Sequence, residues 1–412
     1  MSGPLLICLN SEILIAMLHK YLVCINVLVI ALVQGCSFPV QESIDYCAKQ
    51  ASRTLEAVES PDRIPNSVPS GSSEWVFTSP GNWTCGFWAG DLWYLFEGTG
   101  DPRWKDEAIK ATEAIMPVAY RPAKSHDMGF MTMTSIGNAY RITGDERYKE
   151  ALVSAADSLA RLYNPVVGTI LSWPNMVTRM GWPHNTIIDN MLNLDLLFWV
   201  AGHADRPDLY DIAFRHAEVT MQHQFREDGS TYHVMVFDAE DGHFIEGHTH
   251  QGWKDESTWA RGQAWAIYGF TMAYRFTKDK RFLETAVKAA DYFLSNLPED
   301  LIPYWDFDAG RELADQPRDC SAAAITASAL LELQTYLPSD KAGTYKDKAV
   351  AIIKVMSAEP YRAGETCSAF ILHCTGHMPN GSEVDASISY ADYYYIESLI
   401  RIQRLQKRDI VF

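Results

Sequence analysis

Apolar residues recur along this chain at intervals of three and four positions over most of its length. The stretch from Arg147 to Tyr163 shows the pattern clearly, since its apolar side chains would form one broad stripe on a helix. This spacing predicts amphipathic α-helices, because strands place apolar residues at every second position. The stripe consists of Ala151, Val153, Ala155, Ala156, Leu159, Ala160 and Leu162.

A short turn sequence separates successive helical stretches and repeats along the chain. We expect its Asp to cap the free N–H groups of the following helix, and Gly to allow the tight turn before it. Looser copies of the sequence are centred on Asp205 and Asp340. The three clear copies are Thr99-Gly-Asp101-Pro-Arg103, Thr143-Gly-Asp145-Glu-Arg147 and Thr277-Lys-Asp279-Lys-Arg281.

Two helices joined by such a turn form a hairpin that cannot bury its apolar face alone, so serial hairpins stack on one another. An early helix expected near residues 41–58 brings the set to about six hairpins. The predicted fold class is therefore all-α, an (α/α)6 toroid of six helical hairpins with its pocket at one end of the barrel. An open helical solenoid stays the alternative, because the turns are unevenly spaced.

Composition narrows the domain organisation. The chain has 412 residues, 47% of them hydrophobic and 12% aromatic, and this mixture runs evenly from Trp75 to Tyr395 without a linker. We therefore expect residues 38–412 to form a single domain. A net charge of -17 argues against nucleic acid as a partner.

The first 37 residues have a different pattern. A charged start at residues 17–20, an apolar run from Tyr21 to Val33 and small residues near Gly35 predict a secretory signal over residues 17–37. Residues 1–16 are interpreted as an upstream extension. A membrane anchor is the alternative, but this apolar run is too short to span a bilayer. We expect a secreted or secretory-pathway protein with no membrane association once the signal is removed.

The cysteines are scattered, and the sequence contains no CxxC, which argues against a zinc site. An oxidising compartment would allow one or two disulfides among them. Cys367 and Cys374 form the only close pair along the chain, although pairing does not follow from sequence alone.

Several blocks combine ionisable or amide side chains with Gly and bulky aromatics. Carboxylates suit proton transfer, rings suit stacking on a sugar face, and Arg suits an acidic sugar. These residue types together favour an enzyme acting on carbohydrate. The blocks include His126-Asp127-Met128-Gly129-Phe130, Ile187-Ile188-Asp189-Asn190, Thr249-His250-Gln251-Gly252-Trp253 and Trp259-Ala260-Arg261-Gly262-Gln263-Ala264-Trp265.

With these blocks in this order, the chain resembles the unsaturated glucuronyl hydrolases of glycoside hydrolase family 88 from about Trp75 to Arg401. The resemblance implies an (α/α)6 barrel with a catalytic pocket and with no metal and no cofactor. It also implies unsaturated uronyl oligosaccharides as the substrates. Further matching blocks are Asn82-Trp83-Thr84-Cys85-Gly86-Phe87-Trp88, Asp228-Gly-Ser-Thr-Tyr-His233, Pro303-Tyr304-Trp305-Asp306 and the segment from His377 to Asp392.

The family's chemistry acts on the 4,5-unsaturated uronic acid that polysaccharide lyases leave at the non-reducing end. Water adds across the C4=C5 vinyl ether, C4 takes a proton, and the resulting hemiketal collapses to release the neighbouring sugar. One carboxyl can deliver the proton and later draw one from water. Its pKa must be raised for it to donate near neutral pH.

Asp189 matches the family's acid/base position and has apolar neighbours in sequence, which favour a protonated carboxyl. The alternative is an Asp that caps the following helix. Asp127 is the expected partner carboxylate, which orients substrate hydroxyls or raises the first pKa. Its alternative is a loop Asp bonded to its own backbone.

The resemblance implies substrate contacts for seven further residues. His233 and Gln251 correspond to positions that contact the sugar ring and the attacking water, although a structural His is the alternative at 233. Arg261 suits the uronate carboxylate, or else fixes a carboxylate of the pair. Taken singly, a Trp is more often core packing than a platform for a ligand, so the Trp sites depend on the resemblance. The expected substrate-binding set is Trp83, Trp88, His126, His233, Gln251, Arg261 and Trp265.

Other functions remain open at this point. An unsaturated rhamnogalacturonyl hydrolase acting on pectin fragments would share the fold and the chemistry. An (α/α)6 epimerase would use several His as bases, and a non-catalytic sugar-binding toroid would need no carboxyl pair. A monomer or a weak homodimer is expected. The linkage and the aglycone sugar cannot be predicted.

Overall fold

The computed structural model describes residues 38–407 of the chain. The predicted extension and signal over residues 1–37, with Cys8, Cys24 and Cys36, lie outside the described residues. The residues from Val40 onward form one compact unit. No helix in this described part is both long and apolar enough to cross a membrane.

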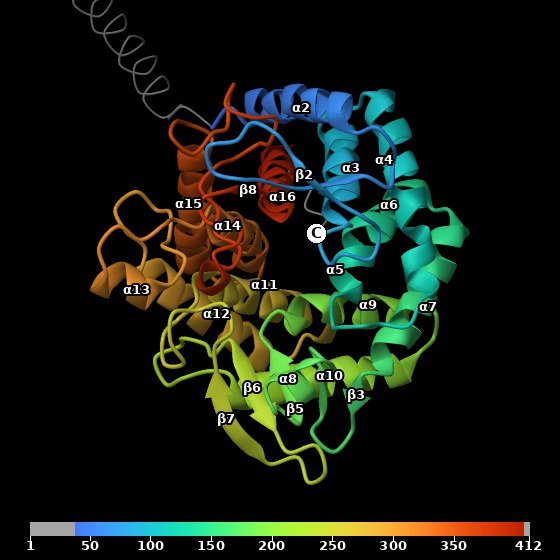
Figure 1. Cartoon of the computed structure of the whole chain (residues 1–412), viewed down its shortest axis with the longest axis vertical. Helices are drawn as coiled ribbons and strands as arrows, with labels where there is room; N and C mark the ends of the chain where they lie inside the picture. Colours follow the sequence, from blue (N-terminus) through green and yellow to red (C-terminus); the bar gives the residue numbers. More distant parts are fainter. Residues whose placement is uncertain (1–37, 408–412) are drawn as a thin grey trace, which may run out of the picture. The chain divides into compact units, whose positions relative to one another are not determined.

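The unit is an all-α (α/α)6 barrel, as predicted, in which six inner helical segments form a closed ring (Figure 1). Each inner segment packs against its neighbours, and the last one closes on the first. Most are buried on nearly all sides. They are α3 (Phe87–Thr99), α5 (Met128–Thr132) continued by a π-helical turn (Met133–Gly137) and α6 (Asn138–Thr143), α9 (Asn190–His203), α11 (Ala260–Thr277), α14 (Cys320–Leu333) and α16 (Ser389–Lys407).

The outer helices each bury one face against this ring and expose the other. Their apolar positions follow the helical spacing of the sequence, which explains why one face alone is buried. They are α2 (Val40–Ala57), α4 (Pro102–Ile115), α7 (Glu146–Ala160), α10 (Pro207–His223), α12 (Lys280–Ser295) and α15 (Ser339–Met356). Short α8 (Met176–Arg179), α13 (Phe307–Glu312) and 3-10 turns (Met116–Tyr120, Gln334–Tyr336, Met378–Asn380) lie in connections.

The repeated turn joins inner to outer helices as predicted at its three clear copies. Asp101, Asp145 and Asp279 are the N-cap residues of α4, α7 and α12, and each carboxylate accepts a backbone N–H two residues on. The preceding Gly100, Gly144 and Lys278 have the left-handed conformation that ends the inner helix.

The looser copies were wrong as capping sites. Asp205 has φ 53° and precedes Arg206, which is the N-cap residue of α10 without a side-chain cap bond. Asp340 lies inside the first turn of α15, where Pro338 is the N-cap residue. Pro207 already supplies a helix-compatible φ at the start of α10, so that helix begins without a capping carboxylate.

Short antiparallel strands lie in the longer connections that precede inner helices. Among them, β5 ends two residues before Asp189 and pairs with β6, which follows His233. This pairing brings the two residues together from positions far apart in sequence. The described sheets are β2 (Val76–Thr78) with β1 (Ile64–Val68) and β8 (Ser387–Ile388), β3 (Tyr163–Asn164) with β4 (Thr169–Ile170), and β5 (His184–Ile187) with β6 (Val234–Phe237) and β7 (Phe244–His248).

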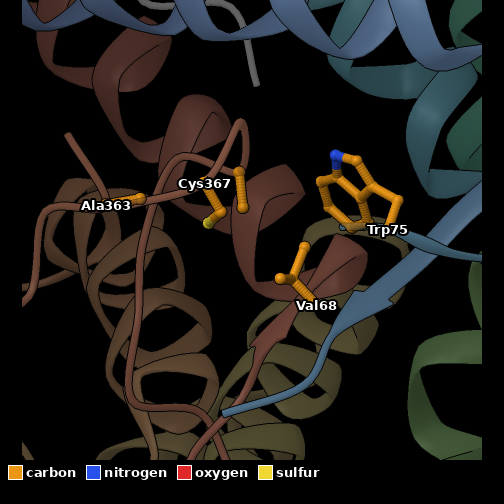
Figure 2. Close-up of a cluster of buried hydrophobic side chains, with 5 residues drawn as sticks. Val68, Trp75, Ala363 and Cys367 are labelled. Atoms are coloured by element: carbon orange, nitrogen blue, oxygen red, sulfur yellow. The ribbon is translucent and has the colours of Figure 1, made fainter. Parts of the chain in front are cut away.

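A small buried cluster joins the first strands to a late loop (Figure 2). Val68 and Trp75 pack with Ala363 and Cys367 in it. The Trp75 indole N–H donates to Ser368 Oγ at 2.9 Å, so its polar atom is satisfied. This cluster fixes the β1–β2 hairpin.

The suggested disulfides do not form among the described cysteines. Cys47, Cys85, Cys320, Cys367 and Cys374 are all free and buried. Burial raises the pKa of each of these thiols, so they behave as small apolar side chains.

Candidate active site

The two predicted carboxylates lie at the N-terminal ends of neighbouring inner helices. Asp127 is the N-cap residue of α5 and Asp189 that of α9, and α5 packs against α9. Neither side chain makes a capping hydrogen bond. The helix-capping alternative for Asp189 is therefore wrong, and both carboxylates are left for other partners.

Asp189 is mostly buried, and its Oδ2 has no hydrogen-bond partner. Burial raises the pKa of this carboxyl to about 6, since the charged form loses its hydration. His126 and Arg261 lower the pKa of Asp189, while the charge of Asp127 raises it. The carboxyl is thus able to hold a proton close to neutral pH.

His233 faces Asp189 with a defined tautomer. Its Nδ1 accepts the backbone N–H groups of His250 and Gln251, at 3.0 and 3.1 Å. Burial lowers the pKa of His233 well below 6.5, so the ring is neutral and its proton sits on Nε2. Nε2 lies 3.8 Å from Asp189 Oδ2, and neither atom has another hydrogen-bond partner. A donor and a carboxyl therefore face the same small space.

Asp127 is held from both sides of its carboxylate. Ser125 Oγ donates to Oδ2 at 2.6 Å, and His126 Nε2 lies 3.2 Å from Oδ1. The other ring nitrogen of His126 is 3.3 Å from the Ser172 carbonyl. The alternative of a loop Asp bonded only to its own backbone does not fit these contacts.

Trp173 is an aromatic wall of the site that sequence reasoning missed. It is half-buried, and its ring lies 6.1 Å from His126, 5.8 Å from His233 and 5.3 Å from His250. It follows β4 in an irregular connection, where no helical pattern or repeated block drew attention to it. Trp83, which was predicted, is also half-buried and packs against Phe130 at 5.7 Å.

Two of the predicted tryptophans do not face this space. Trp88 lines a separate hollow of about 300 Å³ between α2, α3 and α4, because its place on α3 turns the indole outward. Trp265 is completely buried and packs against Phe130 and Tyr394. The expectation that both rings stack on sugar is not supported, since one lies elsewhere and the other is covered.

Arg261 is buried, and its hydrogen bonds go to groups other than the two carboxylates. Nη1 binds Asp319 Oδ2 at 3.0 Å and the Thr375 carbonyl at 2.6 Å, while Nη2 binds the Gly376 carbonyl at 2.5 Å. Arg261 therefore pairs with Asp319, and not with Asp127 or Asp189 as one of its two expected roles required. Sequence reasoning missed Asp319, which also caps α14.

Gln251 contacts the same loop as Arg261. Its Nε2 donates to the Gly376 carbonyl at 3.2 Å, and its backbone N–H donates to His233. The loop continues to His377, both of whose ring nitrogens are buried and unpartnered. His377 lies 4.9 Å from His250 between ring centres, so this side of the site is lined by imidazoles.

A larger cavity, of about 440 Å³, lies within the ring of inner helices and extends from the first turn of α5 at Gly129 toward the C-terminal end of α16 at Arg404. Its charged groups pair with one another: Arg275 with Asp195 and Glu332, and Arg401 with Glu332 and Glu397. Among the described residues, these charged groups of the cavity are paired, unlike Asp189 Oδ2 and His233 Nε2.

One group of side chains in the described residues has spacing that could hold a metal ion. Asp238, Asp241 and His243 have ligand atoms within 4.8 Å of one another at the tip of the β6–β7 hairpin. Asp241 and His243 are exposed and already bonded to each other at 2.6 Å. This group is separate from the carboxylates at the start of α5 and α9.

Comparisons with known proteins agree with this geometry. The model of Glycosyl Hydrolase Family 88 matches residues 60–403. The chain is 41% identical to the unsaturated glucuronyl hydrolase of Formosa agariphila, over 79% of this chain and 80% of the relative. It is 33% identical to the unsaturated chondroitin disaccharide hydrolase of Streptococcus pneumoniae, over 78% and 82%. A crystal structure of an unsaturated glucuronyl hydrolase specific for heparin superposes with a TM-score of 0.84 at 39% identity, covering 90% of this chain and 99% of that one.

Proposed function

Because this chain belongs to Glycosyl Hydrolase Family 88, we propose that Asp189 is its acid/base and Asp127 the partner carboxylate. The enzyme is a glycoside hydrolase that releases a 4,5-unsaturated uronic acid from the non-reducing end of oligosaccharides. The observation that carries the residue assignment is the partnerless Asp189 carboxyl, whose pKa of about 6 lets it donate a proton. The related pectin-fragment hydrolase is not favoured, since the relatives are glucuronyl and chondroitin disaccharide hydrolases.

In the first step, protonated Asp189 gives its proton to C4 and positive charge develops at C5 and the ring oxygen. Water then attacks C5 and returns a proton to the Asp189 carboxylate, which restores the acid. The C5 hemiketal opens to a ketone, and the hemiacetal left at C1 expels the neighbouring sugar. Each step conserves protons and electrons without an oxidant or a co-reactant.

The neighbours of Asp189 suit these steps. The N–H of His233 Nε2 is unpartnered and can bond the attacking water or the sugar ring beside Asp189. Asp127, held by Ser125 and His126, supplies an acceptor for substrate hydroxyls and keeps a negative charge near Asp189. Trp173 supplies a partly exposed ring for the sugar face.

The parent polysaccharide is proposed to be a glycosaminoglycan. The support is the description of the relatives, one as a chondroitin disaccharide hydrolase and one as specific for heparin. The test is a panel of lyase-generated disaccharides from heparin, chondroitin and pectin, followed by the loss of absorbance of the conjugated uronate. Faster turnover of the pectin fragment than of both others would overturn this choice.

Export is proposed from the pattern of residues 17–37, which lie outside the described part of the chain. N-terminal sequencing of the protein made in its own cells tests this proposal. A mature chain that retains residues 17–37 would contradict it.

A further inference from the structure

Asn193 is a buried side chain on α9 that reaches both carboxylate-bearing segments. Its Nδ2 donates to the Asp189 carbonyl at 3.2 Å, four residues earlier on its own helix. Its Oδ1 accepts the backbone N–H of Phe130 on α5 at 2.8 Å. Only 1% of the residue is exposed, so these bonds do not compete with water.

The hydrogen bond that the Phe130 N–H donates to Asn193 Oδ1 replaces the capping bond that the side chain of Asp127 would ordinarily make. Phe130 is the third residue of α5, and the N–H at this position is the usual partner of the side chain of an N-cap residue. Here Asn193 caps that N–H from another helix, while Asp127 makes no cap bond. The Asp127 carboxylate is thereby free to bind Ser125 and His126.

Gly129 allows this cross-helix bond to form. A Cβ at residue 129 would lie 2.5 Å from the Cα of Asn193 and 2.8 Å from its Oδ1, closer than real Cβ atoms approach. The first turn of α5 therefore rests directly on the backbone of α9. With both helix starts in contact, the Asn193 amide is the polar link between them.

We propose that Asn193 is a positioning residue for the reaction: it caps α5 in place of Asp127 and so fixes the two carboxylates in their working separation. The proposal rests on the proposed roles of Asp127 and Asp189. Asn190, another buried Asn of the same helix, binds Ser172 and the Ile170 carbonyl instead and does not make this link.

The test replaces Asn193 with Leu, which has the same number of side-chain heavy atoms in the same branched arrangement and no polar atoms. Phe130 N–H then loses its acceptor, and the carboxylate of Asp127 is the nearest replacement cap. We expect kcat to fall about 100-fold with a smaller change in KM, because a misplaced catalytic group loses transition-state contacts first. The Asp127→Asn substitution, which we expect to lower kcat in the wild-type enzyme, should add little to Asn193→Leu.

The matched control is Asn138→Leu. Asn138 is a buried Asn of inner helix α6 that lines the larger cavity, donates to the Thr134 carbonyl and accepts from Arg141. It should lower thermal stability but leave the pH dependence of kcat unchanged. If Asn193→Leu does not fold, Asn193→Ala removes the same two bonds without added bulk and replaces it.

A second readout needs no substrate. The ionisation of Asp189 in the folded protein is followed as the pH at which the stability difference between the wild type and Asp189→Asn stops growing, which is the midpoint of its folded-state titration. In the Asn193→Leu background this midpoint should move to lower pH, since Asp127 has turned toward Phe130 N–H. Three results with a folded Asn193 variant would overturn the inference. They are a kcat equal to that of the wild type, an unchanged midpoint, and a loss of kcat on adding Asp127→Asn as large as in the wild-type background. A wild-type enzyme inactive on every unsaturated disaccharide would instead contradict the proposed function.

Discussion

At the scale of single residues, two buried side chains of the site have atoms without a hydrogen-bond partner, Asp189 Oδ2 and His233 Nε2. Asp189 is the N-cap residue of α9, but its side chain makes no capping hydrogen bond. The Nδ1 atom of His233 accepts two backbone N–H groups, so its Nε2–H is available to bind another group. An unpartnered polar atom in a buried place costs stability, and such costs persist where function needs them. The unpartnered atoms of this pair are the support for our proposal that Asp189 is the acid/base.

Asp189→Asn should abolish nearly all turnover, because the amide has the same shape and cannot exchange a proton. The measurement is kcat on an unsaturated disaccharide, with a thermal melt as the control for folding. Normal activity in a folded Asp189→Asn protein would remove Asp189 from the mechanism.

The same variant should be more stable than the wild type at high pH. The folded-state pKa of Asp189 is raised to about 6, so its contribution to stability is present below about pH 4 and is lost as the pH rises through 6. Above that pH we expect the free energy of unfolding of Asp189→Asn to be higher than that of the wild type by up to about 3 kcal/mol. Urea titrations of both proteins at pH 4 and pH 8 measure this, and an equal difference at both pH values would contradict it.

Asp127→Asn should shift the basic limb of the kcat profile to lower pH, in addition to lowering kcat. The negative charge of Asp127 raises the pKa of Asp189, so its removal lets Asp189 lose its proton earlier. A shift of less than about one pH unit is expected for one charge at this distance. A basic limb that stays in place or moves to higher pH would show that the two carboxylates are not coupled.

At the scale of elements, the same turn sequence ends an inner helix and caps the following outer helix at three places. The Thr before each turn donates to a carbonyl four residues earlier and accepts the N–H of the capping Asp, and that Asp caps the next helix. Its Arg then folds back onto the Asp at two of the three sites. A local pattern of this kind was predictable, because every partner lies within a few residues.

Asp279→Ala tests the connector between α11 and α12. It removes the acceptor of the Arg281 backbone N–H and should destabilise the protein by about 1 kcal/mol. Asp347→Ala, at an exposed position within α15, is the matched control and should leave the melting temperature nearly unchanged. Equal effects of the two substitutions would show that the cap does not stabilise the helix.

Contacts between distant segments were less predictable. The motif blocks correctly pointed to one end of the barrel for Asp127, Asp189, His233 and Gln251. The sequence did not reveal Trp173 or Asp319, since their roles depend on loops that meet only in the folded chain. The sequence also suggested that Trp88 and Trp265 bind the sugar. A motif identifies a residue but does not give the direction in which its side chain leaves the helix.

At the scale of the whole molecule, the starts of the inner helices gather at the end that holds the site. Asp127, Asp189, Arg261 and Asp319 all lie within two residues of such a start. Unpaired N–H groups and aligned peptide dipoles make these ends attractive to anions. A protein of net charge -17 can therefore still receive an acidic sugar at this end of the barrel.

Matched disaccharides that differ only in the C4=C5 bond should differ in turnover by orders of magnitude. A saturated glucuronide can fill the same site but offers no vinyl ether to protonate, so the path to the hemiketal is absent. Comparable rates on the two would indicate direct glycosidic cleavage and would reassign Asp127 and Asp189 as a conventional pair.

The inner ring is closed by contact between α16 and α3, its last and first helices, and this has a consequence for biosynthesis. α16 packs against α2 and α3, and Gln403 bonds to Gln41 across more than 350 residues of chain. While the ribosome is still making the chain, the apolar inner faces of the earlier helices have no final neighbour to cover them. Closure must wait for the last segment to emerge, so we expect a chain that stops before α16 to leave α3 and α14 uncovered and to lose the whole fold and not just its end.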